Sequence, residues 1–336
     1  MKQLGRLLPL TAIILLLAGC GEVNLTALDP QGPIAEMQLS LIKLSLYIMI
    51  IVIVIVFAIF AFVLWRFRDK PGDKHIPKQV EGNHTLEIIW TTVPIILLLI
   101  IAIPNVMDTF TLANVEADEN SITVKVTGHQ FWWEFEYPDH DVVAGQDMYI
   151  PTNTKVIVHL EASDVMHSFW VPALAGKQDN VPGITNEMWI KAVNPGVYKG
   201  KCTELCGEGH WLMDFKVIAV EPDVFDSWAQ NMAQPAKDPV TAQAEAGRDV
   251  FQASCIGCHA VGGVGGNPAV GGPDLTNFGE RTVIAGFLEF NDENLEEWLR
   301  YPEKKKPGNK MPAFDHLNDE EMKALIEYMK GLKVLD

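Results

Sequence analysis

Four residues within twelve positions offer ligands that suit copper. Cys202 and Cys206 supply two thiolates, and His210 and Met213 supply an imidazole and a thioether. Thiolates four residues apart can both bridge two copper ions, with the histidine and the methionine as terminal ligands and a second histidine from elsewhere in the fold. His167 is the best candidate for that histidine. Two coppers bridged by two sulfurs share one electron with little change of bonding, so the cluster predicts an electron relay rather than a catalyst.

Two other roles are open to these cysteines. A tetrahedral zinc site uses the same thiolates, although zinc does not ordinarily recruit a thioether such as that of Met213. A disulfide between Cys202 and Cys206 is the stronger alternative if the segment is exported.

A second cluster, Cys255-Ile-Gly-Cys258-His259, has the two thiols and adjacent histidine of a covalently attached c-type haem. The thiols add to the haem vinyl groups and His259 ligates the iron. Met311 lies on a predicted loop before the last helix, and we expect it to be the sixth ligand because thioether ligation raises the haem potential into the range of electron carriers. Met311 considered alone is also compatible with a place in the hydrophobic core.

Two apolar runs are long enough to cross a membrane. Leu39 to Leu64 contains one charge, Lys43, and Ile88 to Val106 contains none, although it includes Pro94 and Pro104. About 20 apolar residues span a bilayer, and neighbouring helices can satisfy the backbone groups that proline frees. The segment between the runs is basic, which predicts that it stays cytoplasmic and that both ends of the mature chain face outward; its charges include Arg66, Arg68, Lys70, Lys74 and Lys78.

The N-terminus has the pattern of an export signal. Lys2 and Arg6 precede an apolar stretch, 7–17, that meets Ala18-Gly19-Cys20. This predicts a lipoprotein signal peptide over 1–19, with Cys20 as the lipidated first residue of the mature chain; an ordinary signal or an uncleaved anchor is the alternative. The net charge of −17 disfavours nucleic acid as a partner and favours basic partners, or serves solubility.

The remainder divides into an all-β part and a helical part. Short strands separated by turn residues predict a small antiparallel sandwich or barrel, with the segment from Cys202 to Met213 as a loop between two late strands. Helical periodicity predicts a helix leading into the haem motif and another over 319–332, with Asn318 and Glu321 as a capping pair. The predicted strands are 121–127, 131–137, 155–160, 188–193 and 215–220, and the predicted organisation is a transmembrane hairpin over 20–110, a sandwich over 111–222, a linker over 223–240 and a helical domain over 241–336.

These residues together resemble subunit II of the bacterial haem-copper cytochrome c oxidases, of the kind whose subunit II carries its own cytochrome c domain. The resemblance covers nearly the whole chain. It implies a cupredoxin-like β-sandwich, a class I cytochrome c domain and a plasma-membrane location with both domains on the outer face. The motifs that carry it are Glu87 to Pro94, Gly128 to Tyr137, Asp164 to Pro172, Cys202 to Met213 and Cys255 to His259.

The resemblance also implies the roles of individual residues. Glu204, between two copper ligands, adds its main-chain carbonyl to the copper pair, known as CuA, and its side chain reaches a magnesium ion at the contact with subunit I; otherwise it is a surface carboxylate. Glu87 lies at the mouth of a proton path into subunit I, or acts simply as a favourable acid at a helix N-terminus. The full CuA ligand set implied by the resemblance is His167, Cys202, Glu204, Cys206, His210 and Met213.

One position departs from the family pattern. The family usually has a tryptophan after Gly128-His-Gln that receives electrons from soluble cytochrome c, whereas this chain has Phe131 followed by Trp132 and Trp133. A haem domain tethered by a linker has an effective concentration near millimolar and needs no optimised docking patch. Trp132 or Trp133 is a possible substitute on the electron path, although packing in a sheet explains at least one of them.

The expected function is electron input to an oxidase. Electrons pass from an external cytochrome c or an upstream reductase complex, through the fused haem c and CuA, to the haem and copper of subunit I, where oxygen is reduced and protons are pumped. This chain has no catalytic residue of its own for that chemistry, so subunit I is required and subunit III is expected. A quinol oxidase subunit would lack the copper ligands, and a free-standing electron carrier would have little use for Glu87 and Glu204.

Overall fold

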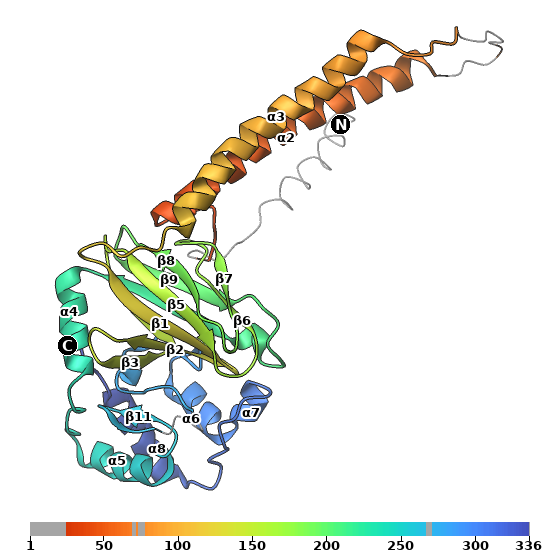
Figure 1. The fold of residues 1–336 in the computed structure, drawn as a ribbon. Helices are drawn as coiled ribbons and strands as arrows, with labels where there is room; N and C mark the ends of the chain where they lie inside the picture. Colours follow the sequence, from red (N-terminus) through yellow and green to blue (C-terminus); the bar gives the residue numbers. More distant parts are fainter. Residues whose placement is uncertain (1–24, 69–71, 73–77, 267–270, 336) are drawn as a thin grey trace, which may run out of the picture. The chain divides into compact units, whose positions relative to one another are not determined.

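The computed structural model describes residues 25–68, 72, 78–266 and 271–335. The predicted signal peptide, Cys20, Lys70 and Lys74 lie outside the described residues. One compact unit comprises residues 36–116, and the rest of the described chain forms the other. Each unit is considered by itself (Figure 1).

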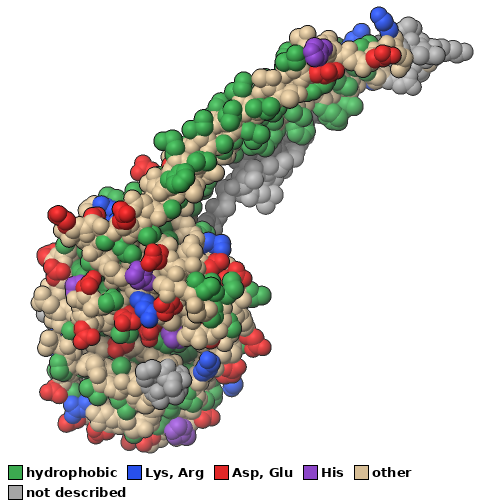
Figure 2. Space-filling model, in the orientation of Figure 1, with side chains coloured by type: hydrophobic (Ala, Val, Ile, Leu, Met, Phe, Trp, Pro, Cys, Tyr) green, Lys and Arg blue, Asp and Glu red, His purple; other side chains and the backbone are tan. Residues whose placement is uncertain are grey.

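The first unit is built on two long helices, α2 (Pro33–Arg66) and α3 (His84–Ala113). Both contain the predicted apolar runs and extend beyond them at each end. Asn83 caps α3, because its side chain accepts a hydrogen bond from the main-chain N–H of Leu86 at 3.1 Å. The mean hydropathy of their most apolar windows is 3.4 and 2.5, and none of those windows is buried. Figure 2 shows apolar side chains along the outside of these helices, as a bilayer would require.

The second unit begins with a sandwich of two five-stranded sheets, with strand orders β3-β2-β1-β5-β8 and β4-β10-β9-β6-β7. Alternate residues of β1 and β2 are buried, which places their apolar faces against the other sheet. Both sheets are mixed, because β1 pairs with β5 and β4 with β10 in parallel, so the expectation of antiparallel sheets was wrong in this detail. The strands are β1 (Ile122–His129), β2 (Trp132–Tyr137), β3 (Val142–Gly145), β4 (Asp147–Pro151), β5 (Val156–Ala162), β6 (His167–Trp170), β7 (Lys177–Asn180), β8 (Asn186–Ile190), β9 (Gly196–Cys202) and β10 (Asp214–Val220).

The first part of the predicted linker is an ordered helix, α4 (Pro222–Met232), so the prediction of a linker over 223–240 was wrong for these residues. Phe225, Trp228 and Met232 are buried on one face of α4. Trp228 stacks on Tyr149 of β4, with 4.5 Å between the ring centroids. The helix therefore covers the sandwich, and its apolar spacing outweighs the Ala, Gln and Pro content of the segment that follows.

The C-terminal domain is helical, with α5 (Ala242–Ser254), α6 (Asp292–Arg300), α7 (Pro302–Lys305) and α8 (Asp319–Gly331). The capping box predicted for α8 is present, with hydrogen bonds in both directions between Asn318 and Glu321. α5 and α8 pack closely because Gly247 has no side chain: a Cβ there would lie 1.9 Å from the carbonyl oxygen of Ala324. The apolar face predicted for α8 forms the core of this domain and comprises Met322, Leu325, Ile326, Met329 and Leu332.

Short two-residue strands and 3-10 turns complete this second unit. β11 (Ala260–Val261) pairs with β12 (Val264–Gly265), and β13 (Val283–Ile284) pairs with β14 (Leu288–Glu289). The turns are η1 (His210–Leu212) in the sandwich domain and η2 (Phe278–Glu280) in the C-terminal domain. The predicted arrangement of a two-helix hairpin, a β-sandwich and a helical domain is confirmed.

Candidate metal centres

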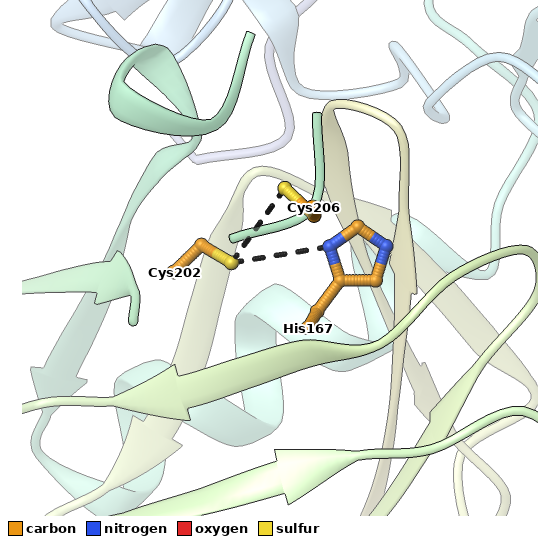
Figure 3. Close-up of side chains that lie close together, drawn as sticks. All are labelled: His167, Cys202 and Cys206. Atoms are coloured by element: carbon orange, nitrogen blue, oxygen red, sulfur yellow. Dashed lines mark hydrogen bonds between the residues drawn. The ribbon is translucent and has the colours of Figure 1, made fainter. Parts of the chain in front are cut away.

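The copper candidates converge at one end of the sandwich. Cys202 ends β9 and Met213 directly precedes β10, so the intervening residues form a loop between two paired strands. His167 begins β6, whose Phe169 pairs with Cys202 across the sheet. The histidine thus stands at the start of a strand, and Figure 3 shows its ring beside both cysteines.

The donor atoms lie within contact distance of one another. The two sulfurs are 3.9 Å apart, and the main-chain oxygen of Glu204 lies 3.2 Å from the Cys202 sulfur. The Nδ1 atom of His167 is 3.9 Å from the Cys202 sulfur, that of His210 is 3.6 Å from the Cys206 sulfur, and the Met213 sulfur is 3.8 Å from the Cys206 sulfur. The donors thus surround a space between the two cysteines.

This spacing bears on the three alternatives of copper, zinc and a disulfide. A disulfide requires about 2.05 Å between sulfurs, and both cysteines are free. His167, Cys202 and Cys206 form a buried group able to hold a metal ion. The additional thioether and main-chain carbonyl fit soft copper better than tetrahedral zinc, which closes its shell with four nitrogen or sulfur ligands.

The two thiols influence each other's protonation. The hydrogen bond between the two sulfurs, together with contacts to His167 and two main-chain groups, lowers the pKa of Cys202. The thiolate formed at Cys202 in turn raises the pKa of Cys206, as burial does too. Cys202 is therefore readily a thiolate. Binding of a cation would release the proton of Cys206 as well.

Asp164 orients His167. Its Oδ1 atom lies 2.9 Å from Nε2 of the ring, which leaves Nδ1 directed toward the sulfurs. Burial opposes protonation of His167, but the hydrogen bond from Asp164 outweighs it and raises the pKa of the ring. Although burial alone would raise it, hydrogen bonds from His167 and from the N–H groups of Gln130 and Val165 lower the pKa of Asp164 to about 2. Gly128 leaves room for the ring, because a Cβ there would lie 2.8 Å from a His167 carbon.

Replacing Asp164 by asparagine is expected to weaken copper retention by about 10- to 100-fold, the usual effect of removing a partner that orients a metal ligand. Competition with a copper chelator measures this directly. Asp226→Asn on the exposed face of α4 is the matched control and should bind copper as the parent does. Equal retention in Asp164→Asn and the control would show that His167 needs no such partner.

Phe131, Trp132 and Trp133 lie in three different environments. Trp133 is fully buried, and its indole N–H donates to the Met213 carbonyl at 3.3 Å. Trp132 stacks on His129, with 4.2 Å between ring centroids. Phe131 is 4% exposed and lies against the loop between Cys202 and Met213, which we call the copper-binding loop. A Cβ at Gly209 of this loop would lie 2.5 Å from the Phe131 ring. Packing explains Trp133, while Phe131 and Trp132 line the cavity described next.

The haem candidates line one cavity of about 310 Å³. Cys255, Cys258, His259 and Met311 all face it, among apolar side chains such as Leu299 and Phe314. Nδ1 of His259 lies 2.8 Å from the carbonyl oxygen of Pro273, which fixes Nδ1–H as a donor and leaves Nε2 for a metal. Burial lowers the pKa of His259, so the ring is neutral, as a ligand must be. Gly271, Gly272 and Pro273 also border the cavity. The two cysteines, His259 and Met311 fit a covalently held haem.

The two acidic candidates lie outside these clusters. Glu87 occupies the first turn of α3, 3.9 Å from the His84 ring, where an acid is favourable. Glu204 contributes its carbonyl to the copper-binding loop, and its side chain is half-buried. Asp164 and Gly128 belong to motifs noted in the sequence, but their contacts with His167 were not predicted.

Comparison with known proteins agrees with the fold. Residues 22–107 match the transmembrane domain of cytochrome c oxidase subunit II, residues 142–220 its periplasmic domain, and residues 244–333 cytochrome c. Cytochrome c oxidase subunit 2 of Alkalihalophilus pseudofirmus is 54% identical over 100% of this chain and 99% of its own. The same subunit of Bacillus sp. strain PS3 is 51% identical over 95% of each chain.

Among solved structures, the periplasmic domain of subunit II of the Bradyrhizobium japonicum cytochrome oxidase is 32% identical, covering 35% of this chain and 96% of that one, with a TM-score of 0.34. The full-length identity to the Alkalihalophilus subunit and the three matched domains are sufficient to assign the family. This membrane protein therefore belongs to the family of cytochrome c oxidase subunit II and carries a cytochrome c domain at its C-terminal end.

Proposed function

We propose that this chain is the electron-input subunit of a proton-pumping terminal oxidase: it passes electrons from cytochrome c, through its own haem c and a dinuclear CuA centre, to the oxygen-reducing site of subunit I. When bound, the copper pair would take up and release one shared electron, and the haem would exchange one electron with its donor. The observation that carries this proposal is the convergence of two thiols, two imidazoles, a thioether and a carbonyl within 3.9 Å contacts.

The protein contributes a rigid and dry ligand cage. Met213 and His167 are 0% exposed, as is Trp133 above them. Asp164 and the Trp133 indole hold the His167 ring and the Met213 carbonyl in place. Because His167 and Met213 are each held by a second contact, little movement of these two residues need accompany a change of charge at the centre.

The surroundings of the two centres follow from the same proposal. The basic segment between α2 and α3 supports a cytoplasmic location for that connection and a location on the outer face of the plasma membrane for both redox domains. Subunit I would receive the hairpin and share a magnesium ion with Glu204, and subunit III would complete the complex. The boundaries at 20, 110 and 240, and the signal peptide with lipidated Cys20, remain part of this proposal.

Oxygen uptake by the purified complex tests the function. We expect the chain to co-purify with a large multi-helix subunit and to support oxygen consumption from reduced cytochrome c. Removal of copper should stop this consumption while leaving the haem c spectrum unchanged. Uptake supported by a quinol but not by reduced cytochrome c would contradict the proposal, as would a redox-active chain that purifies alone.

We propose further that Glu87 lies at the mouth of the proton path into subunit I. Glu87→Ala is then expected to slow proton uptake and oxidase turnover by about 100-fold, the lower end of the range for loss of a proton-transfer group, while copper reduction is unchanged. Turnover and proton release in reconstituted vesicles measure this, with Glu81→Ala as the control acid. Unchanged turnover in Glu87→Ala would leave Glu87 as a helix-terminal acid only.

A further inference from the structure

Lys306 is a lysine in an unusual place. Lys306 is only 3% exposed, although a lysine is almost never fully buried without a partner. Its Nζ atom donates to two main-chain carbonyl oxygens rather than to a carboxylate: that of Phe131 at 2.6 Å and that of Ala285 at 2.8 Å. Neither the copper ligands nor the haem ligands account for this residue.

The two carbonyls belong to different domains. Phe131 connects β1 to β2 of the sandwich, and Ala285 lies in the turn between β13 and β14 of the C-terminal domain. One ammonium group therefore links the domains through buried main-chain groups 154 residues apart in the sequence, from 131 to 285. Removing the donor would leave both carbonyls unsatisfied, at a cost of about 1–3 kcal/mol each.

Keeping a lysine here is costly. Burial lowers the pKa of Lys306 to about 7, despite the opposing influence of negative charge at Asp214 and Cys206. The ring of Phe287 has its centroid 5.7 Å from Nζ and offers only a weak cation–π contact. An apolar side chain of similar length would avoid the cost of desolvation. The hydrogen bonds, rather than favourable burial, are thus the reason for a lysine.

The carbonyl that Lys306 holds belongs to the residue between the two candidate centres. The Phe131 ring lies against Gly207 and Gly209, which separate Cys206 from His210, and against Gly308 of the C-terminal domain. A Cβ at Gly308 would meet this ring at 3.0 Å. Lys306 and Phe131 both line the cavity that the haem ligands face. A shift at this contact would therefore change the distance between the two centres.

We propose that Lys306 is a positioning residue, which fixes the C-terminal domain on the copper-binding loop through the Phe131 and Ala285 carbonyls and thereby sets the rate of internal electron transfer. This inference rests on the proposed function. The step moves one electron from ferrous haem to the oxidised copper pair; the iron becomes ferric, the pair is reduced by one electron, and no bond forms or breaks.

Lys306→Met in the complete oxidase tests this proposal. Methionine keeps an unbranched side chain and removes the donor, and Lys304→Met, at an exposed position of α7, removes the same charge as a control. After photochemical reduction of haem c, electron transfer to copper should be at least about tenfold slower in Lys306→Met, since a misplacement of about 1 Å can slow a reaction 100-fold. Copper content, the haem spectrum and the rate of haem reduction should match those of the control.

A second readout is independent of the cofactors. Hydrogen exchange at residues 129–132 and 285 should be faster in Lys306→Met than in Lys304→Met. Lys306→Gln retains an amide donor and should restore part of both effects; it also carries the test if the methionine variant does not accumulate. Parent-like transfer and exchange in Lys306→Met would overturn the proposal. A parent protein without copper or haem would instead refute the proposed function, and hydrogen exchange would still decide whether Lys306 links the domains.

Discussion

Cys206→Ser is expected to abolish the dinuclear copper centre and to reduce cytochrome c oxidation by more than about 100-fold, because loss of even an orienting partner costs 10- to 100-fold. Cys206 is the contact shared by most of the donor set: its sulfur lies 3.9 Å from Cys202, 3.6 Å from His210 and 3.8 Å from Met213. A serine hydroxyl is a harder donor that binds copper poorly and cannot bridge two ions as a thiolate does. Metal analysis and oxygen uptake measure the effect.

Cys258→Ser is the matched control for this substitution. Cys258→Ser makes the same replacement of sulfur by oxygen in the other cluster. This variant should retain two copper ions and lose one covalent link to the haem. Full copper content and parent-like oxygen uptake in Cys206→Ser would contradict the assignment of Cys206 as a bridging ligand.

Met311→Leu should have the second large effect. Methionine and histidine as axial ligands raise a haem potential, and axial ligand identity spans about 0.8 V in proteins. Loss of the thioether should therefore lower the haem c potential by on the order of 0.1 V. Since 59 mV corresponds to a factor of ten for one electron, the ratio of reduced to oxidised haem at a fixed donor potential should fall more than tenfold. Redox titration followed by the haem spectrum measures this.

The control for Met311→Leu is Met322→Leu. Met322 is fully buried in α8 and belongs to the core of the same domain, but it does not line the haem cavity. Met322→Leu should lower the free energy of unfolding of the domain by less than about 1.5 kcal/mol. The haem c potential should not change. A potential in Met311→Leu equal to that of the control would return Met311 to a packing role.

The copper donors were predictable because four of them occur in one loop. Any loop between two paired strands brings residues four to seven apart into contact, and His167 needed only to start a neighbouring strand. Asp164 and Lys306 could not be found in this way. Lys306 reaches Phe131 across 175 positions, and only the packing of one domain on another determines such a contact.

Local patterns likewise explain which elements the sequence predicted. α8 has both a capping box and a regular apolar face, and it begins where expected. β9 was not among the predicted strands because glycine and lysine interrupt its alternation. Gly200 is required there, since the ring of Phe215 from β10 lies over it and a Cβ would meet that ring at 2.3 Å. A cross-strand partner thus compensates for a residue that disfavours strands when read alone.

Electron paramagnetic resonance of the oxidised, copper-loaded protein, together with metal analysis, tests the dinuclear centre most directly. The arrangement of His167, Cys202, Cys206, His210 and Met213 predicts two copper ions per chain and a hyperfine pattern from one electron shared equally between them. A single-copper pattern, a protein that takes up only zinc, or a chain that binds no copper after correct maturation would contradict it.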